Sequence, residues 1–308
     1  MVLAPASVAN VVCGFDVMGF ALNDVNDRMV LRLLDEPIVR ISNCDTYELP
    51  TNPDENVIGV ALQALMERVD EPIGFEVIST KIIKPGSGIG SSAASAAGAV
   101  VAANHLLNNR FSKKELVECA MAGEALASGS KHADNIAPVI YGGFTIVRSL
   151  DPLDIISITP PDLYVTILHP QIEVKTAEAR ALLQPVVPLD KAIAQWANVA
   201  GLVAGMLLKD YGLIGRSLVD HVVEPTRQHL IPGYKSVKNV MDKAQALGGG
   251  ISGSGPSMFA LSTSRSIAEE VLNEGLKVYD DLGIICHGYV TTINHTGVQL
   301  KQVEYEVC

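Results

Sequence analysis

The sequence carries little positive charge, few aromatic side chains and no long apolar run. Its 308 residues include 23 Lys and Arg against 34 Asp and Glu, a formal net charge of -11. Because binding a polyanion would begin from electrostatic repulsion, this balance argues against nucleic acid as a partner. The longest largely apolar stretch, Ala197 to Leu208, is too short to span a bilayer. We therefore expect no nucleic-acid partner and no membrane segment.

The cysteines and the N-terminus also lack familiar signals. The five cysteines fall at no metal-binding or disulfide spacing, and the start "MVLAPASVAN" has neither the basic residues nor the apolar core of a signal peptide. These absences predict a reduced, cytoplasmic protein. A hydrophobic content of 48% with only 5% aromatics predicts an aliphatic core, large enough for one large domain or two ordinary ones.

What is present is an alternation of short strand patterns and helical patterns without an internal repeat. Strands are predicted at Val30–Leu34, Val39–Ser42, Phe75–Thr80, Phe144–Arg148, Ile155–Thr159, Tyr164–Leu168 and Tyr289–Ile293, with a hairpin around "GGGISGSGPSMFALS". Helices are predicted at Asn56–Val69, from the Ser/Ala run to Asn108, and at Lys113–Ala127, Thr176–Leu183, Leu189–Lys209, Gly233–Leu247 and Ile267–Leu282. This order indicates an α+β protein with a mostly antiparallel sheet in each half.

The stretch "KPGSGIGSSAAS", Lys84 to Ser95, combines three glycines with the start of a small-residue helix. Its third glycine comes one residue too early for a dinucleotide fingerprint, and no lysine follows Gly90 as a Walker A loop requires. A helix N-terminus offers free backbone N–H groups and a positive dipole end, and bare glycines let an anion approach. The stretch therefore predicts a phosphate cradle, with a plain tight turn as the alternative.

Three separated segments, "PASVANVVCGFDVMG", "KPGSGIGSSAAS" and "GGGISGSGPS", resemble the three motifs of the GHMP small-molecule kinases in the same order. Within that family, "HADNIAP", "KTAEAR" and "EPTRQHLIPG" are most similar to the members that phosphorylate the side-chain hydroxyl of L-homoserine with ATP and Mg²⁺, a step of threonine biosynthesis. Since several independent patches agree, the resemblance implies this activity.

The resemblance also implies a two-domain GHMP kinase fold. Residues 1–160 would form an ATP-binding domain similar to domain 2 of ribosomal protein S5, with a left-handed β-α-β unit, and residues 161–308 a ferredoxin-like domain. Such handedness would be an exception to the usual right-handed crossover. The active site would lie in the cleft between the two domains, and a homodimer is possible.

Nucleotide and metal positions follow from the same resemblance. The nucleotide would be held by Pro85, Gly86, Ser87, Gly88, Ile89, Gly90, Ser91, Ser92, Ala93, Ala94 and Ser95, with Asn56 at the adenine. Mg²⁺ prefers oxygen ligands, and the candidates are the Glu124 carboxylate and the Ser92 hydroxyl, with Ser91 close behind. Glu124 could instead be a solvated surface residue, and Asn56 a simple helix cap.

An amino-acid acceptor needs a carboxylate for its ammonium group and guanidinium groups for its carboxylate. The positions that match those roles in the family are Asn10, Asp16, His132, Asn135, Thr176, Arg180 and Arg227. Taken singly, Asp16 could cap a turn and each Arg could lie on the surface, so their agreement with one substrate carries the assignment. Asn135, Glu124, Ser92 and Arg180 are the candidate catalytic residues, because they would face the reacting groups.

A general base is missing from this set. Other GHMP kinases place an Asp near the acceptor hydroxyl, whereas the matching residue here is Asn135, whose amide takes no proton at neutral pH. Asp134 precedes Asn135, but on a helix its side chain would point in a different direction, so it would be a poor substitute for the base. A loose transition state needs little early deprotonation, so we predict catalysis by alignment and charge neutralisation. The alternatives are a mevalonate- or shikimate-type kinase and a regulator that binds metabolites without catalysis.

Overall fold

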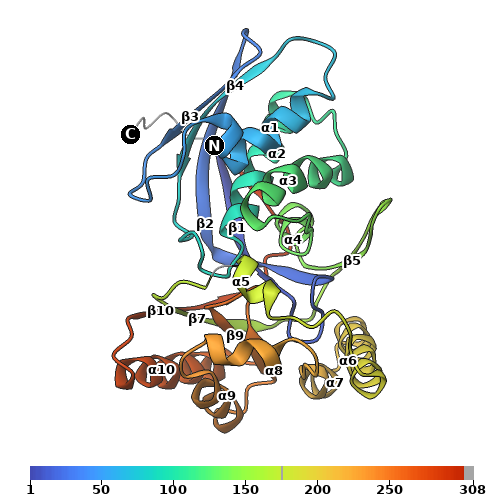
Figure 1. Cartoon of the computed structure of the whole chain (residues 1–308), viewed down its shortest axis with the longest axis vertical. Helices are drawn as coiled ribbons and strands as arrows, with labels where there is room; N and C mark the ends of the chain where they lie inside the picture. The colour runs from blue at the N-terminus through green and yellow to red at the C-terminus, as the bar shows by residue number, and fades with distance from the viewer. Residues whose placement is uncertain (175, 302–308) are drawn as a thin grey trace.

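The computed structural model describes residues 1–174 and 176–301 of the chain, and in it two β-sheets lie one above the other (Figure 1). The first sheet contains β1 (Val2–Ala9), β2 (Met18–Leu34), β3 (Val39–Asn43), β4 (Gly74–Thr80), β5 (Phe144–Leu150), β6 (Leu153–Ile158) and β11 (Gln299–Leu300). Its strands are ordered β11-β1-β2-β4-β3, and β5 pairs with β2 and β6. Among the described strands, only β3 and β4 pair in parallel, so the expected antiparallel character is confirmed.

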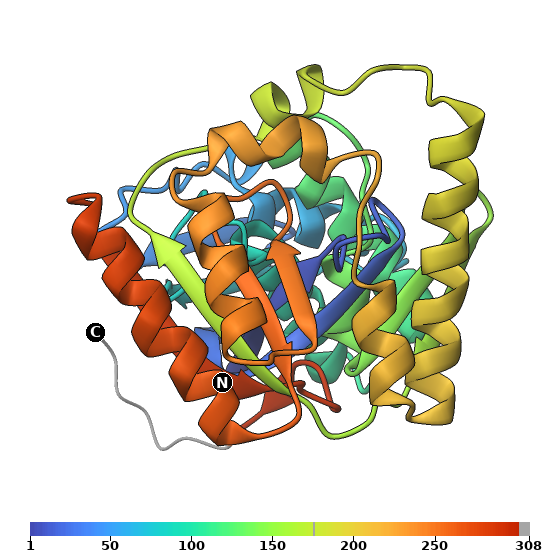
Figure 2. The same ribbon diagram turned by 90° about the horizontal axis from the view of Figure 1, so that it is seen from below.

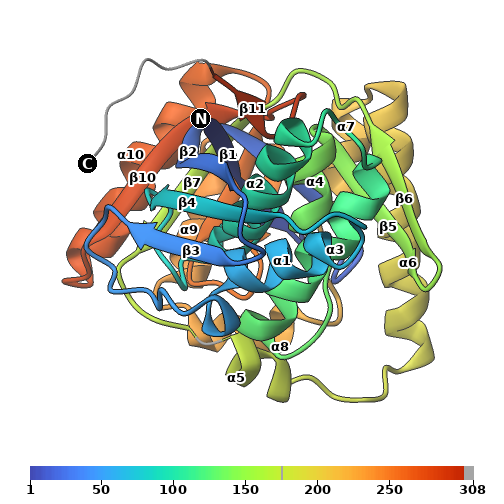
Figure 3. The same ribbon diagram turned by 90° about the horizontal axis from the view of Figure 1, so that it is seen from above.

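Helices from the first half of the chain cover one face of the first sheet (Figure 3). They are α1 (Val57–Met66), α2 (Ser91–Leu106), α3 (Lys113–Ser128) and α4 (Ile136–Tyr141), and a short 3₁₀ turn, Pro53–Glu55, precedes α1. The capping box that predicted the start of α3 is present: the Ser112 hydroxyl accepts the N–H of Glu115, whose carboxylate accepts the N–H of Ser112. This pair fixes the start of the helix that carries Glu124.

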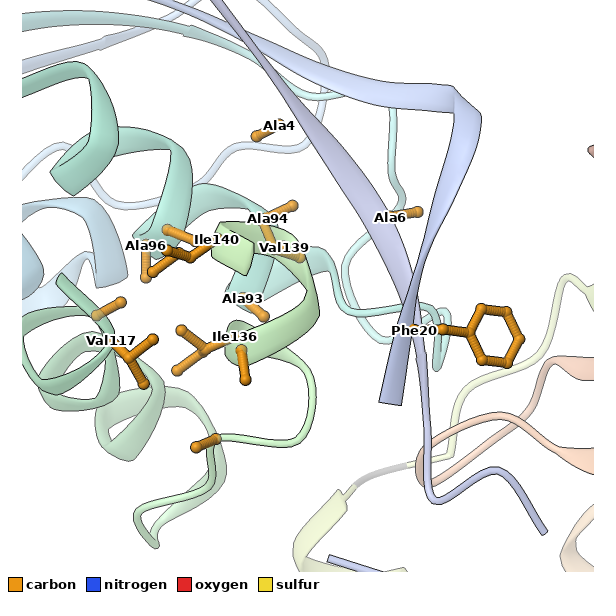
Figure 4. Packing of buried hydrophobic residues seen from close by; sticks show 14 of the residues in the cluster. Ala4, Ala6, Phe20, Ala93, Ala94, Ala96, Val117, Ile136, Val139 and Ile140 are labelled. Carbon is orange, nitrogen blue, oxygen red and sulfur yellow. The ribbon is translucent and has the colours of Figure 1, made fainter. Parts of the chain in front are cut away.

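Helix α2 packs in the middle of this layer because its side chains are small. Ala93, Ala94, Ala96 and Ala97 are fully buried, and Figure 4 shows the alanines of α2 facing Ile136, Val139 and Ile140 of α4 and Val117 of α3. Small side chains let neighbouring helices and strands approach closely and fill the interior at high density. The helix that follows the glycine loop is therefore held firmly in place.

The second sheet has the strand order β10-β7-β9-β8. Its strands are β7 (Tyr164–Pro170), β8 (Gly248–Ile251), β9 (Met258–Ser262) and β10 (Cys286–Thr292). The helices of this half are α5 (Thr176–Ala181), α6 (Leu189–Leu208), α7 (Tyr211–Ser217), α8 (Glu224–Arg227), α9 (Tyr234–Lys243) and α10 (Arg265–Asp281), with a 3₁₀ turn at Gln228–Leu230. This connectivity is the expected ferredoxin-like arrangement, and the predicted hairpin is β8–β9.

Three features differ from the sequence-based expectations. Strand β2 is 17 residues long instead of the short Val30–Leu34, and β1 was not predicted as a strand. The chain returns to the first sheet at its end, where β11 pairs with β1. Cys44 is disulfide-bonded, which the spacing of the cysteines did not indicate, whereas Cys13, Cys119 and Cys286 are free.

Candidate active site

The glycines of the Lys84–Ser95 loop are required by its backbone. Gly86, Gly88 and Gly90 have φ angles of 73°, 82° and 71°, in the left-handed region that favours glycine. A Cβ atom on Gly90 would lie 2.0 Å from the Ser7 hydroxyl, so a side chain is also excluded by space. Gly90 is the N-cap of α2, and no side chain caps this N-terminus. Its backbone N–H groups are therefore available to an anion.

The late glycine hairpin supports this loop from the second sheet. The Ser252 hydroxyl donates to the carbonyl of Gly88 at 2.8 Å, and the Ser257 hydroxyl donates to the carbonyl of Ser87 at 2.6 Å. A Cβ on Gly88 would lie 2.6 Å from the carbonyl oxygen of Gly255. The hairpin thus approaches the backbone of the loop closely, which explains why both segments are rich in glycine.

A cavity of about 500 Å³ opens beside the loop, with walls from both halves of the chain. Most of the predicted site residues line it: Asn10, Asp16, Pro85, Gly86, Ser87, Gly88, Gly90, Ser91, Ser92, Ser95, Glu124, His132, Asn135, Arg180 and Arg227. Ile89, Ala93 and Ala94 are buried in the core instead. Thr176 begins α5, but its side chain lies outside the described part of the structure.

Asn56 caps α1. Its side-chain oxygen accepts the N–H of Ile58 at 2.8 Å, and its amide donates to the carbonyl of Pro50. Asn56 itself does not line the cavity, although its neighbour Val57 and the nearby Leu49 do. Its side chain therefore has a structural function in α1, and its contact with the adenine stays a prediction.

Glu124 is buried on α3 with 8% of its surface exposed. Burial raises the pKa of this carboxyl to about 7, and a hydrogen bond with Ser92 partly offsets the effect. Ser91 differs, since its hydroxyl donates to the carbonyl of Ile83 at 2.7 Å. Ionising a buried carboxyl such as that of Glu124 is costly without a nearby positive charge. Together with the Ser92 hydroxyl beside the phosphate loop, its carboxylate is therefore a suitable ligand for a bound cation.

No group of three or more His, Cys, Asp or Glu side chains that could hold a metal exists among residues 1–174 and 176–301. Mg²⁺ that enters with a nucleotide is bound mainly by phosphate oxygens and water, and such a site needs only one or two ligands from the protein. Glu124 and Ser92 supply one carboxylate and one hydroxyl. The donor set therefore suits a metal that enters with a nucleotide.

Asp16 and Arg180 form an ion pair in the cavity. One guanidinium nitrogen of Arg180, Nη2, donates to both carboxylate oxygens of Asp16 at 2.7 Å. His132 lies 3.8 Å from the same carboxylate, and burial lowers its pKa, although the charge of Asp16 opposes this shift. Asp16 and Arg180, which we predicted to bind the ammonium and carboxylate groups of an amino acid, thus bind each other in this structure. About a third of each side chain is exposed.

Asn10 holds Asp16 in position. Its side-chain oxygen accepts the N–H of Asp16 at 3.0 Å, and its amide donates to the carbonyl of Gly253 at 2.7 Å. Both residues have positive φ angles, 71° for Asn10 and 60° for Asp16, in the tight turn that follows β1. Asn and Asp tolerate this conformation better than other non-glycine residues. Asn10 therefore links the turn to the late hairpin.

The ring of Phe15 contacts both arginines, and sequence reasoning missed it. The guanidinium carbons of Arg180 and Arg227 lie 5.3 Å and 5.0 Å from the centre of its ring. Arg227 is 3% exposed, and its Nε donates to the carbonyl of Ala179 at 3.0 Å. Its pKa is lowered by burial and then by the charge of Arg180. The ring brings two like charges together, which makes the spot attractive to a carboxylate.

Asn135 is oriented by a second residue that the sequence did not single out. The buried Ser7 hydroxyl donates to the side-chain oxygen of Asn135 at 2.8 Å. This bond leaves the NH₂ group of Asn135 as the donor for a ligand. Asn135 directly precedes α4 and does not cap it with its side chain. Its amide is therefore free to act in the cavity.

Asp134 also lines the cavity, and it is not helical, because α4 begins at Ile136. The expectation that a helix would turn it away was wrong on this point. Burial raises the pKa of its carboxyl to about 7, and the charges of Asp16 and Glu124 add to the effect. The neighbouring backbone N–H groups of Asp134 and Asn135 partly offset this shift.

Two lysines near the loop have structural partners. Lys81, 5% exposed, is ion-paired with the buried Asp27 and donates to the carbonyl of Ser91 at 2.8 Å. Lys84 donates to the side chain of Gln171 at 3.0 Å, and it does not line the cavity. Lys81 thus ties the start of α2 to β2, and a buried lysine of this kind has no distinctive sequence signal.

Two family descriptions match the chain and together cover more than half of it. "GHMP kinases N terminal domain" matches residues 56–143, and "GHMP kinases C terminal" matches residues 202–281. The first match contains the glycine loop, Glu124 and Asn135, and the second contains Arg227 and the late hairpin. Both halves of the cavity therefore belong to this family's architecture.

Individual relatives agree with these matches. The chain is 46% identical over 284 residues to "Homoserine kinase" of Chlorobaculum tepidum, covering 87% of each sequence, and 38% identical over 299 residues to that of Xanthomonas campestris, covering 96% of this chain and 92% of the relative. A crystal structure of homoserine kinase from Cytophaga hutchinsonii superposes with a TM-score of 0.93 at 48% identity, covering 97% of this chain and 96% of that one. A mevalonate kinase from L. major shares the fold with a TM-score of 0.72 at 17% identity, covering 96% of each chain. With the loop, the cavity and these relatives in agreement, the chain belongs to the homoserine kinases of the GHMP kinase family.

Proposed function

We propose that this protein transfers the γ-phosphate of ATP to the side-chain hydroxyl of L-homoserine, giving O-phospho-L-homoserine and ADP. The observation that carries the proposal is the cavity that joins an uncapped, glycine-rich helix N-terminus to a carboxylate and two guanidinium groups. One end suits phosphate, and the other suits the ammonium and carboxylate of an amino acid. The identity with homoserine kinases over most of the chain supports this substrate.

Each substrate has its own part of the cavity. The backbone N–H groups of Gly86 to Ser92 would hold the phosphates of ATP, since the α2 N-terminus is free of capping side chains. The ammonium group of homoserine would bind Asp16, and its carboxylate would bind Arg180 and Arg227. The Asp16–Arg180 ion pair would have to open for this binding: the substrate's ammonium group would replace Arg180 at Asp16, and its carboxylate would replace Asp16 at Arg180.

Glu124 and Ser92 would hold Mg²⁺ together with the phosphates. When bound, such a metal neutralises charge on the transferring phosphoryl group and fixes its direction. The chain's own contribution is the carboxyl of Glu124, whose burial leaves its charge poorly solvated and raises its pKa to about 7. The energetic preference of Glu124 for a cation would therefore help to bind the metal–nucleotide complex.

The hydroxyl of homoserine would be aligned by the amide of Asn135 and not deprotonated by the protein. The Ser7 hydroxyl donates to the oxygen of this amide, so its NH₂ group would be the donor to the acceptor oxygen or the phosphate. Phosphoryl transfer through a loose transition state gains most from positioning, and the phosphate can take the proton late. The buried Asp134 would help to keep the turn at Asn135 in shape, since it directly precedes this residue in the wall of the cavity.

The pH dependence of kcat separates this mechanism from one in which Asp134 is the base. A base with a pKa of about 7 would be protonated and inactive at low pH, so kcat would rise about tenfold per pH unit below 7 and level off above it. We expect kcat at saturating Mg²⁺–ATP to stay nearly flat through this range once substrate ionisation is accounted for, because the bound cation would keep the Glu124 carboxylate ionised. Asp134→Asn should lower kcat without changing the shape of the profile. An ascending limb that the substitution removes would identify Asp134 as the base.

The activity is tested by ADP release with a panel of alcohols: homoserine, mevalonate, shikimate and galactose. We expect turnover with homoserine, and kcat/KM for the other alcohols lower by about a hundredfold or more, since they leave the buried Arg227 or the Asp16 carboxylate without a partner. Turnover with mevalonate alone would indicate a different kinase. Tight binding of homoserine and ATP without ADP release would indicate a regulator that has lost catalysis.

The division into domains at 1–160 and 161–308 remains a proposal. The boundary falls between β6 and β7. Strand β6 belongs to the first sheet, and β7 is the first strand of the second sheet. Strand β11 then returns to pair with β1, so the last described strand would belong to the N-terminal domain. Limited proteolysis near residue 160 would test whether the two parts separate.

A further inference from the structure

The ring of Phe15 occupies a place in the cavity to which the proposed phosphoryl transfer gives no function. Phe15 lies in the tight turn between β1 and β2, directly before Asp16, and it lines the cavity. The two guanidinium groups over its ring come from α5 and α8. These helices lie side by side (Figure 2, yellow-green and orange) and are joined by the hydrogen bond from Arg227 to the Ala179 carbonyl. One ring from the first half of the chain thus meets two cations from the second half.

Packing in an apolar core does not account for this ring. The described residues form two cores of buried apolar side chains, and Phe15 belongs neither to them nor to the partly buried side chains packed against them. Its neighbours differ, since Cys13 is in the first core and Val17 packs against it. Phe15 itself is only partly buried. A large apolar side chain outside both cores, with two cations over its ring, is positioned to bind those cations.

The two guanidinium groups repel each other, so a stabilising contact is needed to hold them together. Burial, and then the charge of Arg180, lower the pKa of Arg227. A carboxylate shared between the arginines would remove the repulsion, but it would also occupy the N–H groups that a substrate carboxylate needs. The face of an aromatic ring attracts a cation and has no oxygen that could compete for these donors. Phe15 therefore stabilises the pair and leaves it able to bind an anion.

Arg180 needs this contact most when its ion pair opens. Its Nη2 donates to the Asp16 carboxylate, whereas its Nε is buried and has no hydrogen-bond partner among residues 1–174 and 176–301. When the ammonium group of a substrate replaces Arg180 at Asp16, the contact with Phe15 does not have to break. Phe15 and Asp16 are neighbours in one turn, so the ring would keep the guanidinium close to the carboxylate that it has left. The Nε would then be a further donor for a substrate carboxylate.

We propose that Phe15 is a positioning residue that makes the site selective for acceptors with a free carboxylate. The ring holds Arg180 and Arg227 as a preformed pair while Arg180 leaves Asp16, so the repulsion between two like charges is already offset before the substrate binds. This inference rests on the proposed binding of homoserine between these groups. Phe15 acts through the two arginines, and an acceptor without a carboxylate gains nothing from the ring.

Replacing the ring by an aliphatic side chain should affect the binding of one substrate only. Phe15→Leu keeps an apolar group but removes the aromatic face, and we expect KM for homoserine to rise about tenfold, the scale of two cation–ring contacts in a partly desolvated site. KM for ATP and kcat should change by less than about twofold, because the loss concerns acceptor binding alone. Phe15→Tyr keeps the ring and should restore KM to within about threefold of the wild type. A wild-type KM for homoserine in Phe15→Leu would overturn the proposal.

Fluorination separates the charge distribution of the ring from its size. Fluorine withdraws electrons from the face of a ring and weakens its attraction for a cation, whereas the shape hardly changes. With phenylalanines of increasing fluorine content at position 15, KM for homoserine should rise in steps and KM for ATP should stay constant. The matched control is the same series at Phe111, which packs against the first core and does not line the cavity. The control should leave both KM values unchanged. A series at Phe15 without a trend would show that the ring only fills space.

The effect of the ring should depend on the carboxylate of the acceptor. The ratio of kcat/KM for homoserine to kcat/KM for its uncharged amide measures the preference for a carboxylate, and it should fall about tenfold in Phe15→Leu. Equal losses on the acid and the amide would give the ring a purely structural function and contradict the inference.

A double-mutant cycle without substrate separates this inference from the proposed function. If the ring binds the Arg227 guanidinium, Phe15→Leu should lower the free energy of unfolding less in an Arg227→Ala background than in the wild type. Additive effects would show that the two side chains do not interact, and they would overturn the inference even if homoserine is the substrate. Coupled effects in a protein with no turnover of homoserine would support the contact and count against the proposed function alone.

Discussion

Glu124→Gln is expected to preserve the fold and the binding of ATP but to lower kcat by about a hundredfold. Glutamine keeps the size of the side chain and a hydrogen bond to Ser92, and it removes the negative charge that would face the metal–nucleotide complex. Loss of one preorganised electrostatic partner of a phosphoryl transfer costs about 2–3 kcal/mol in the transition state. Steady-state kinetics of ADP release at saturating Mg²⁺ measure the effect.

The matched control is Glu118→Gln on the same helix. Glu118 pairs with Arg68 at 2.9 Å, and about a third of its side chain is exposed. Since it has no contact with the cavity, kcat should change by less than about twofold, as for most surface charges. A normal kcat in Glu124→Gln would leave the buried carboxyl without a catalytic function. A large loss in the control would indicate that α3 tolerates no change of charge.

The loop was predictable because its geometry depends on local chemistry. Three glycines before a run of Ser and Ala predict a loop of bare backbone at the start of a closely packed small-residue helix, and the structure has both. The same holds for the capping box of α3, whereas the role of Glu124 followed only from the family resemblance and its burial was left open by the sequence. The loop and the capping box are encoded by neighbours in the sequence, so they can be deduced without knowing the tertiary fold.

Contacts between distant segments could not be deduced in this way. The ion pair of Asp16 and Arg180 joins residues 164 positions apart, and the bond of Ser7 to Asn135 joins residues 128 positions apart. Phe15 stands inside the motif that identified Asp16, yet nothing in the sequence showed that two guanidinium groups would stack on it. Such partners depend on how the two sheets are placed, which motif spacing does not specify.

The extent of the strands was also underestimated. Polar residues such as Asn23 and Asp27 interrupt the apolar pattern of β2, so only its regular end was recognised. The structure accommodates them with specific partners: Asn23 donates to Thr292 at 2.8 Å, and Asp27 pairs with Lys81. A buried charge is tolerated where it is paired and hydrogen-bonded, and periodicity alone does not reveal the partner.

Arg227→Ala is expected to raise KM for homoserine far more than KM for ATP. The guanidinium of Arg227 is almost fully buried, and its hydrogen bonds in the described part of the chain go to the backbone carbonyls of Ala179 and Gly253. Arg180, in contrast, already has the Asp16 carboxylate as a partner. Arg227 is thus the guanidinium that gains most from a substrate carboxylate. Loss of a buried charged pair costs about 2–4 kcal/mol, or about thirtyfold to a thousandfold in kcat/KM.

Two variants separate this effect from a general loss of structure. Arg227→Lys should recover only part of kcat/KM, because an ammonium group is a point charge and lacks the planar fork of guanidinium. Arg216→Ala removes an exposed arginine of α7 that does not line the cavity, and it should leave both KM values unchanged. A defect confined to KM for ATP would remove Arg227 from the acceptor site.

The substrate provides the complementary half of the experiment. A homoserine derivative with its carboxylate converted to an uncharged amide should be poor for the wild type, because Arg227 would stay buried without an anion. The same derivative should lose little more in Arg227→Ala, since the interaction is already absent from one side. The two losses would then be strongly non-additive, which measures the contact between the guanidinium and the carboxylate directly. Equal losses on the acid and the amide would mean that Arg227 acts through the position of α5, where it binds the Ala179 carbonyl, and not through the substrate.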